Sequence, residues 1–150
     1  MSKTRVVVKS GEGERLNVLG TGLRFLCSAD KTDRAWSLME VEVPESAGAP
    51  PHQHPWDEAY YVLEGSITFV VNGKEQTLAA GDFVYLPGGT LHGFRGASPR
   101  PARTLIFDAP AHAESFFREL EREVKDLPRD LSKLPDIAER HQIRMLPIAS

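Results

Sequence analysis

Short apolar and β-branched runs alternate with turn residues along the middle of this chain. Runs of four to eight such residues, separated by Gly, Pro, Asn or Asp, are typical of β-strands. The pattern predicts strands over residues 23–28, 36–43, 58–63, 66–71, 75–78, 82–86, 91–95 and 103–107. Many short strands with turns between them indicate an antiparallel sandwich or barrel rather than a parallel sheet with crossover helices.

Two tight connections support antiparallel pairing. Asn72 and Gly73 lie between two predicted strands, and this pair favours the positive φ angles of a two-residue hairpin turn. The segment 63–66, which contains Gly65, is a second short connection of the same kind. Both predict hairpins between neighbouring strands.

The pattern changes to helical spacing after Asp108. A helix is predicted over residues 114–127, because apolar residues recur there every three or four positions, at Phe116, Phe117, Leu120 and Val124. Pro128 should end that helix, and a shorter one should run from near Pro135 to about His141. An extended tail follows over 143–147. We therefore expect one domain over residues 1–150, with a barrel over about 16–108. A small helical appendage over about 111–142 should pack on the outside of the barrel or on a partner chain.

Composition narrows the class of protein. The 150 residues include 21 acidic and 18 basic side chains, a net charge of -3, which argues against a nucleic-acid-binding surface. No apolar run is long enough for a membrane helix or a signal peptide, and a single cysteine, Cys27, excludes an internal disulfide. We expect a cytoplasmic protein that binds neither nucleic acid nor membranes.

Three histidines and a glutamate form a candidate metal site. His52 and His54 are two residues apart, so they share a face of an extended segment, and Glu58 has the same parity. A straight strand would carry Glu58 too far from His52, so the chain must turn between His54 and Glu58. Residues 55–57, with the sequence Pro-Trp-Asp, suit such a turn.

The fourth candidate ligand, His92, follows a predicted strand and the turn at residues 87–89. That turn could bring His92 back beside the first three side chains. Imidazoles with one carboxylate suit Fe, Mn, Ni, Cu or Zn as divalent ions. The absence of a thiolate argues against a closed structural zinc site, and open coordination positions would remain for water, substrate or dioxygen.

The spacing resembles the two motifs of the cupin superfamily: Gly48-x3-His52-x-His54-x3-Glu58-x6-Gly65 and Gly81-x5-Pro87-x-Gly89-x2-His92. The resemblance implies an all-β fold, a cupin jelly-roll barrel, and one divalent transition metal ion per chain inside it. Carried over by position, the ligands are His52, His54, Glu58 and His92. It also implies a homodimer, which an N-terminal strand would favour. Residues 111–120 resemble, more weakly, the helical tail of single-domain quercetin-dioxygenase-like cupins.

The resemblance favours a dioxygenase that acts on a small enolic or phenolic, flavonol-like molecule, with Glu58 as both ligand and catalytic base. Apolar and aromatic residues expected near the site suit a planar organic substrate: Trp56, Tyr60, Val62, Phe69 and Phe94. No Lys or Arg falls between Gly48 and Lys74, so a phosphate clamp is not expected there. Two alternatives remain open. One is a non-redox isomerase, cyclase or decarboxylase with the metal as Lewis acid. The other is a small-molecule-binding cupin without turnover.

Overall fold

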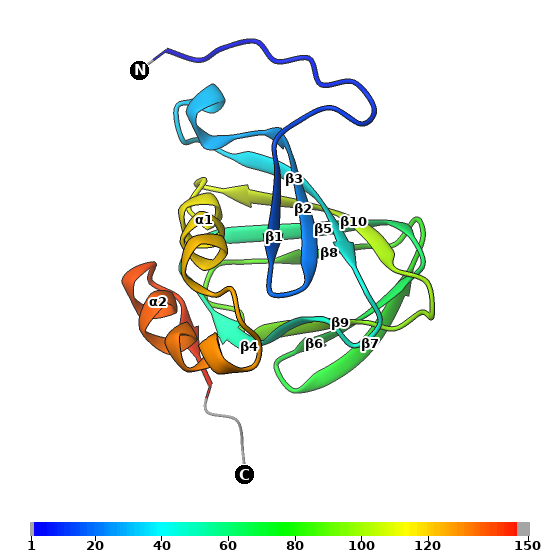
Figure 1. The fold of residues 1–150 in the computed structure, drawn as a ribbon. Coiled ribbons are helices and arrows are strands. Elements are labelled where there is room, and N and C mark those ends of the chain that lie inside the picture. The colour runs from blue at the N-terminus through cyan, green and yellow to red at the C-terminus, as the bar shows by residue number, and fades with distance from the viewer. Residues whose placement is uncertain (1, 147–150) are drawn as a thin grey trace.

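Two antiparallel sheets face each other in the computed structural model, which describes residues 2–146 (Figure 1). The larger sheet has the strand order β1 (Arg15–Val18), β2 (Thr21–Cys27), β3 (Ser37–Val43), β10 (Ala102–Ala109), β5 (Asp57–Glu64) and β8 (Phe83–Leu86). The smaller sheet has the order β11 (Arg144–Met145), β4 (Gly48–Gln53), β9 (His92–Gly96), β6 (Ser66–Val71) and β7 (Lys74–Ala79). This arrangement is the predicted all-β jelly roll, with a C-terminal helical appendage.

All eight strands predicted from the apolar pattern are present, with ends shifted by a few residues. Asn72 and Gly73 both have positive φ, 50° and 81°, as the hairpin between β6 and β7 requires. The apolar pattern misses β1 and β4, although the histidine spacing placed His52 on an extended segment, and β11 lies in the tail expected to be extended over 143–147, of which 147 lies outside the described residues. The hairpin expected at Gly65 is wrong, because β5 and β6 lie in different sheets. β4 contains Pro50 and Pro51, which a central strand rarely accepts, and the structure accommodates them at a register shift between Ala49 and His52.

The core lies between the sheets because alternate side chains of each strand point inward. On β3 the buried positions are Ser37, Met39, Val41 and Val43, and the partner strand β10 alternates in the same way. The opposite face of the larger sheet is exposed and carries an unusual number of large aromatic side chains, which we call the outer aromatic face: Trp36, Tyr61, Phe83, Tyr85 and Phe107. Trp36 and Phe107 stack there, with ring centroids 5.9 Å apart.

The appendage consists of α1 (Ala113–Glu123), the 3-10 helix η2 (Arg129–Lys133) and α2 (Leu134–Arg140). The prediction that α1 continues to residue 127 is wrong, because the helix ends at Glu123. The carboxylate of Asp130, which is buried, accepts hydrogen bonds from the backbone N–H groups of Lys125 and Asp126, at 3.0 and 2.9 Å. Those N–H groups therefore bond to a side chain instead of continuing the helix.

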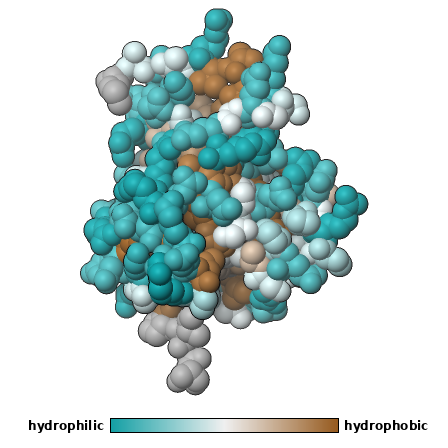
Figure 2. Space-filling view, in the orientation of Figure 1, coloured by the Kyte–Doolittle hydropathy of each residue, from teal (hydrophilic) through white to brown (hydrophobic). Residues whose placement is uncertain are grey.

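The appendage covers one end of the barrel. Helix α1 packs on β1, and β11 extends the smaller sheet by pairing with β4 (Figure 1). An ion pair between Arg118 of α1 and Glu14, with a shortest distance of 2.7 Å, fixes the helix to the chain before β1. In the same orientation, Figure 2 shows apolar surface running down the middle of this face between hydrophilic flanks.

The N-terminal segment forms no strand within a single chain. Residues 6–8 are all Val and favour β-structure, but they lie outside both sheets, and Val7 is 77% exposed. The Thr4 N–H donates to the Lys31 carbonyl at 2.9 Å. Separately, none of the helices within residues 2–146 has the length and apolar content needed to cross a membrane.

Candidate metal centre

Strand pairing brings His52 and His92 together. They are directly opposed on the antiparallel strands β4 and β9, and their ring centroids lie 4.4 Å apart. Gly48 allows this approach: it has φ +151°, and a Cβ atom there would lie 2.1 Å from the carbonyl oxygen of Phe94. Only glycine fits such a contact without moving β9. The glycine at the start of the first motif therefore positions the histidine of the second motif.

Two turns dock against each other to place His54. The backbone N–H of Gly89 donates to the His54 carbonyl at 2.8 Å, and the N–H of Gly88 donates to the Asp57 carboxylate at 2.9 Å. Gly88 packs so closely that a Cβ atom there would lie 2.2 Å from the Pro55 carbonyl oxygen. The turn predicted over residues 55–57 is thus held by the turn at 87–89, and His54 lies one residue beyond the end of β4.

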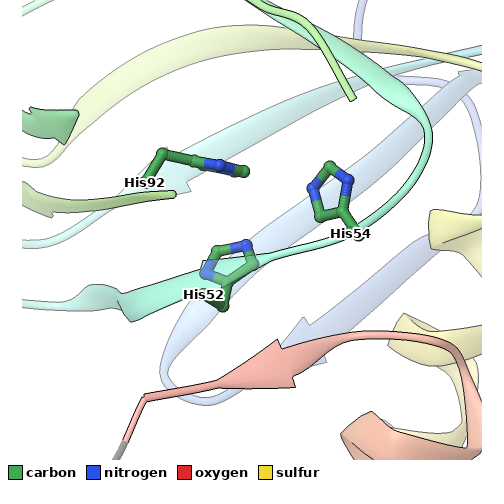
Figure 3. Close-up of side chains that lie close together, drawn as sticks. All are labelled: His52, His54 and His92. Atoms are coloured by element: carbon green, nitrogen blue, oxygen red, sulfur yellow. The ribbon is translucent and has the colours of Figure 1, made fainter. Parts of the chain in front are cut away.

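One nitrogen atom from each of His52, His54 and His92 lies within 4.8 Å of the other two, and the three rings face a common space (Figure 3). Glu58, at the start of β5, adds a buried carboxylate to this cluster. Its Oε2 lies 2.9 Å from the Nε2 of His54, and its Oε1 lies 3.7 Å from the Nε2 of His92. All four residues expected to form the site are therefore neighbours.

Backbone carbonyl groups fix the protonation of the three rings. The Nδ1 of His52 lies 2.8 Å from the Pro50 oxygen, the Nδ1 of His54 lies 3.1 Å from the Trp56 oxygen, and the Nδ1 of His92 lies 2.9 Å from the Thr90 oxygen. A carbonyl oxygen can only accept, so each Nδ1 carries a proton. In the neutral ring, Nε2 then has a free lone pair, as in histidines that bind metals through Nε2.

The buried Nε2 atoms of His54 and His92 have no hydrogen-bond partner within the described chain. Each faces the Glu58 carboxylate, so lone pairs oppose lone pairs at short distance. Such an arrangement is unfavourable unless a proton or a cation lies between the acceptors. One cation can serve all of these donor atoms together, whereas a proton serves one pair. The donor set therefore fits a divalent metal ion.

Burial and the neighbouring charges keep His52 neutral and Glu58 ionised, the forms that bind a cation, but they favour a proton on His92. Burial, together with the nearby His92, lowers the pKa of His52 to about 4, so its ring stays neutral near pH 7. Burial alone would raise the pKa of Glu58, but the imidazole groups of His54 and His92 beside it outweigh that and lower it. Conversely, burial would lower the pKa of His92, and Glu58 raises it instead.

A cavity lies beside the cluster and is lined in part by His52, His54 and Glu58. Its volume is about 730 Å³, which includes the solvent-filled space at its open mouth. Trp56, Tyr60 and Phe94, three of the five expected pocket residues, line it too. Val62 and Phe69 are instead buried in the core outside the lining. Phe69 lies behind that wall, with its ring centroid 5.0 Å from that of Tyr60.

Several lining residues come from the appendage, which sequence reasoning placed on the outside of the barrel. They are Ala113, Phe116, Phe117, Leu120, Leu134, Ile143 and Met145. The apolar spacing along α1 identifies its buried face, but it does not say what that face covers. The appendage is thus part of the wall of the cavity rather than an accessory on the surface.

The lining carries almost no charge. Glu58 is its one charged side chain, and no Lys or Arg lines the cavity among the described residues. A phosphate or carboxylate group placed away from the histidine cluster would lose its hydration without gaining a cationic side chain. The cavity therefore suits a neutral, largely apolar molecule, with the polar histidine cluster at one side.

The fold is a jelly roll, and the histidines and the glutamate inside its barrel form a candidate metal-binding site. Residues 39–108 match the family described as the cupin domain. These residues form a cupin domain, as the two motifs indicated.

Similar proteins include enzymes of different kinds. Quercetin 2,3-dioxygenase of Bacillus subtilis (strain 168) is 34% identical over 116 residues, which cover 76% of this chain and 34% of that protein. The tetracenomycin polyketide synthase protein TcmJ of Streptomyces glaucescens is 28% identical over 74 residues, or 49% of this chain and 50% of that protein. The structure of the polyketide cyclase RemF from Streptomyces resistomycificus superimposes with a TM-score of 0.62 at 26% identity, covering 71% of this chain and 80% of RemF. The chain spans 33% to 50% of the length of the curated relatives it matches.

Proposed function

We propose that this protein is a metal-dependent dioxygenase that acts on a small enolic or phenolic molecule of flavonol type. One observation carries the proposal: three imidazoles and a carboxylate converge beside a cavity that has no cationic residue in its described lining. The imidazole and carboxylate donors favour a divalent ion, and the uncharged, partly aromatic lining of the cavity favours a neutral, planar organic substrate. The similarity to quercetin 2,3-dioxygenase supports the same reaction.

In this proposal His52, His54, Glu58 and His92 hold one divalent transition metal ion per chain, which is Fe, Ni, Mn, Cu or Zn. The ion, when bound, supplies Lewis acidity toward a substrate oxygen and, if it is redox-active, reactivity toward dioxygen. The three Nδ1–H bonds to backbone carbonyls hold each ring in the orientation that binding needs. These hydrogen bonds restrain the rings before the ion arrives.

Glu58 is the proposed catalytic base. Its buried carboxylate borders the cavity, and it can accept the proton that an enol or phenol hydroxyl loses. The Tyr60 hydroxyl donates a hydrogen bond to the Oε1 of Glu58, while Oε2 lies toward His54. Tyr60 therefore orients the carboxylate, and the apolar wall of the cavity keeps bulk water away from the reacting atoms.

Oxygen uptake tests the proposal. Protein loaded with iron, nickel, manganese or copper should consume dioxygen when quercetin or a catechol is added, and zinc-loaded protein should not. Glu58→Gln separates the two roles of this residue: retained metal with lost turnover identifies a base, whereas loss of the metal as well identifies a ligand only. A protein that consumes no dioxygen with any of these ions contradicts the proposal.

A non-redox cyclase is the second candidate, and a specific observation favours it. RemF, a polyketide cyclase, and TcmJ, a polyketide synthase protein, are both similar to this chain. The same uncharged cavity and the same base would serve such a reaction, with the ion acting only as a Lewis acid. Turnover of a substrate without dioxygen, including in zinc-loaded protein, would identify this function. A ligand-dependent rise in melting temperature without any product would identify a binding protein.

We also propose that the protein is a cytoplasmic homodimer that pairs through the outer aromatic face. Two large side chains there are strongly exposed, Phe83 at 62% and Tyr85 at 53%. The same face carries two arginines and two glutamates joined in ion pairs: Arg24, Glu40, Glu64 and Arg103. In a two-fold dimer the same face of each chain meets the other, so apolar side chains can pack on apolar side chains and the arginines can lie near the glutamates of the second copy.

A further inference from the structure

Trp56 lies in the turn between two of the metal-site residues. Its indole ring stacks on the His54 imidazole, with ring centroids 4.1 Å apart and planes only 8° from parallel. The side chain is 2% exposed and lines the cavity. Stacking accounts for the position of the ring, but it makes no use of the indole N–H.

That N–H has no acceptor within the described chain. The buried side-chain atoms without a hydrogen-bond partner there are the Nε2 of His54, the Nε2 of His92 and the Nε1 of Trp56. All three residues lie at the candidate metal centre: the Trp56 ring stacks on His54, and the His54 ring lies beside His92. The two imidazole nitrogens are acceptors, which a metal ion satisfies. The indole nitrogen is a donor, so a metal ion cannot satisfy it.

The other side-chain donors of the cavity lining are already in use. Thr21 donates to the Val18 carbonyl at 2.5 Å, and Tyr60 donates to Glu58. The Nδ1–H groups of His52 and His54 donate to backbone carbonyls. Among the described residues that line the cavity, Trp56 is thus the one whose side-chain donor has no acceptor.

We propose that the indole N–H of Trp56 donates a hydrogen bond to an oxygen atom of the substrate and thereby selects it. This inference rests on the metal site of the proposed function. The substrate then carries two oxygen atoms with separate roles: an enol or phenol oxygen for the ion, and a neutral acceptor, such as a keto or ether oxygen, for Trp56. A buried donor that a ligand leaves unpaired costs binding free energy, so analogues without that acceptor are rejected.

The chain offers a direct measurement, because it contains two tryptophans, Trp36 and Trp56. A proton–nitrogen correlation spectrum of zinc-loaded protein therefore shows two indole signals, and Trp36→Phe assigns them. Adding quercetin or a hydroxynaphthoquinone should move the Trp56 proton downfield, as a new hydrogen bond does. The Trp36 signal, on the outer aromatic face, should stay in place.

Trp56→Phe keeps an aromatic ring over His54 and removes the donor. It should retain zinc and bind these probes roughly five- to tenfold more weakly, whereas Trp36→Phe should bind them like the wild type. An unchanged Trp56 signal on probe binding, equal affinity in Trp56→Phe, or no binding of either probe would overturn the inference. If Trp56→Phe does not fold, the wild-type spectrum alone decides. A separate outcome would contradict the proposed dioxygenase reaction alone: the Trp56 signal shifts on probe binding, but protein loaded with a redox-active metal takes up no oxygen.

Discussion

The Tyr60 hydroxyl donates a hydrogen bond to the carboxylate of Glu58, two residues earlier on β5. Residues two apart on a strand point to the same side, so one strand supplies both the carboxylate and the group that orients it. Burial, with the adjacent Glu58 charge and hydrogen bond, raises the pKa of Tyr60 far above its ordinary value. Tyr60 therefore stays protonated and remains a donor.

Tyr60→Phe should destabilise the metal-free protein by about 1–3 kcal/mol, because it leaves a buried carboxylate oxygen without its donor. Zinc stoichiometry should stay unchanged, since the hydroxyl contacts Glu58 rather than the ion. Urea denaturation and metal analysis measure the two effects. Tyr61→Phe is the matched control, because Tyr61 points to the exposed face of the same strand. Equal stability of the two variants would contradict the role of Tyr60.

His92→Gln should remove most of the bound metal. Wild-type protein should hold about one divalent ion per chain, and chelation should lower its melting temperature, because the ion binds only the folded site. In His92→Gln the chelator should have little effect. His112→Gln, at an exposed position before α1, is the control and should keep its metal. Full metal content in His92→Gln would contradict the assignment of this ligand.

Glu119→Gln tests how α1 is held to the end of α2. Hydrogen bonds from Arg140 and His141 lower the pKa of Glu119 to about 2. Because the pKa in the folded protein lies below the ordinary value of 4.5, the stabilisation is complete above pH 4.5 and is lost as the pH falls toward 2. The variant should be less stable than the wild type near neutral pH, by less than about 1 kcal/mol.

The difference in the free energy of unfolding between the wild type and Glu119→Gln should shrink steadily between pH 4.5 and 2. Chemical denaturation at a series of pH values measures it. Glu139→Gln, at an exposed position on α2, should show no such trend. A difference that stays constant with pH would mean that Glu119 acts through packing rather than through its charge.

Phe83→Lys should convert the proposed dimer to a monomer, because a charge within an apolar interface is costly to bury. The side chain is exposed in the single chain, so the melting temperature of the monomer should change little. Light scattering during size-exclusion chromatography measures the mass. Leu127→Lys, at an exposed position on the appendage, should remain dimeric. A monomeric wild type, or a dimeric Phe83→Lys, would exclude this interface.

The sequence predicts the strands well because alternation along each strand reports directly on burial. The apolar pattern alone does not reveal β4, since Pro50 and Pro51 interrupt it and the strand depends on its pairing with β9, and only the histidine spacing indicated an extended segment there. The end of α1 depends on the buried carboxylate of Asp130, which captures backbone N–H groups of residues 125 and 126. This hydrogen bonding to a side chain leaves no periodic signal in the sequence.

The motif spacing predicted the residues that the structure brings together at the candidate site. His52 and His92 become neighbours through strand register, and the motif glycines permit the close approach. Spacing could not show that the appendage forms a wall of the cavity, because the apolar face of a helix does not indicate which part of the protein it packs against. It also could not show that the donor of Trp56 is free, which depends on where every nearby acceptor lies.

The order of segments along the chain has a practical consequence. The four candidate ligands precede residue 93, whereas α1, α2 and β11, which close the cavity, come from residues 113–145. During synthesis the candidate ligands therefore leave the ribosome before the segments that enclose them. Of these segments, β11 lies beside β4, the strand that carries His52. The described segment before β1 lies on the opposite side of the molecule from β11 in Figure 1, so a purification tag on that segment would be farther from the candidate site.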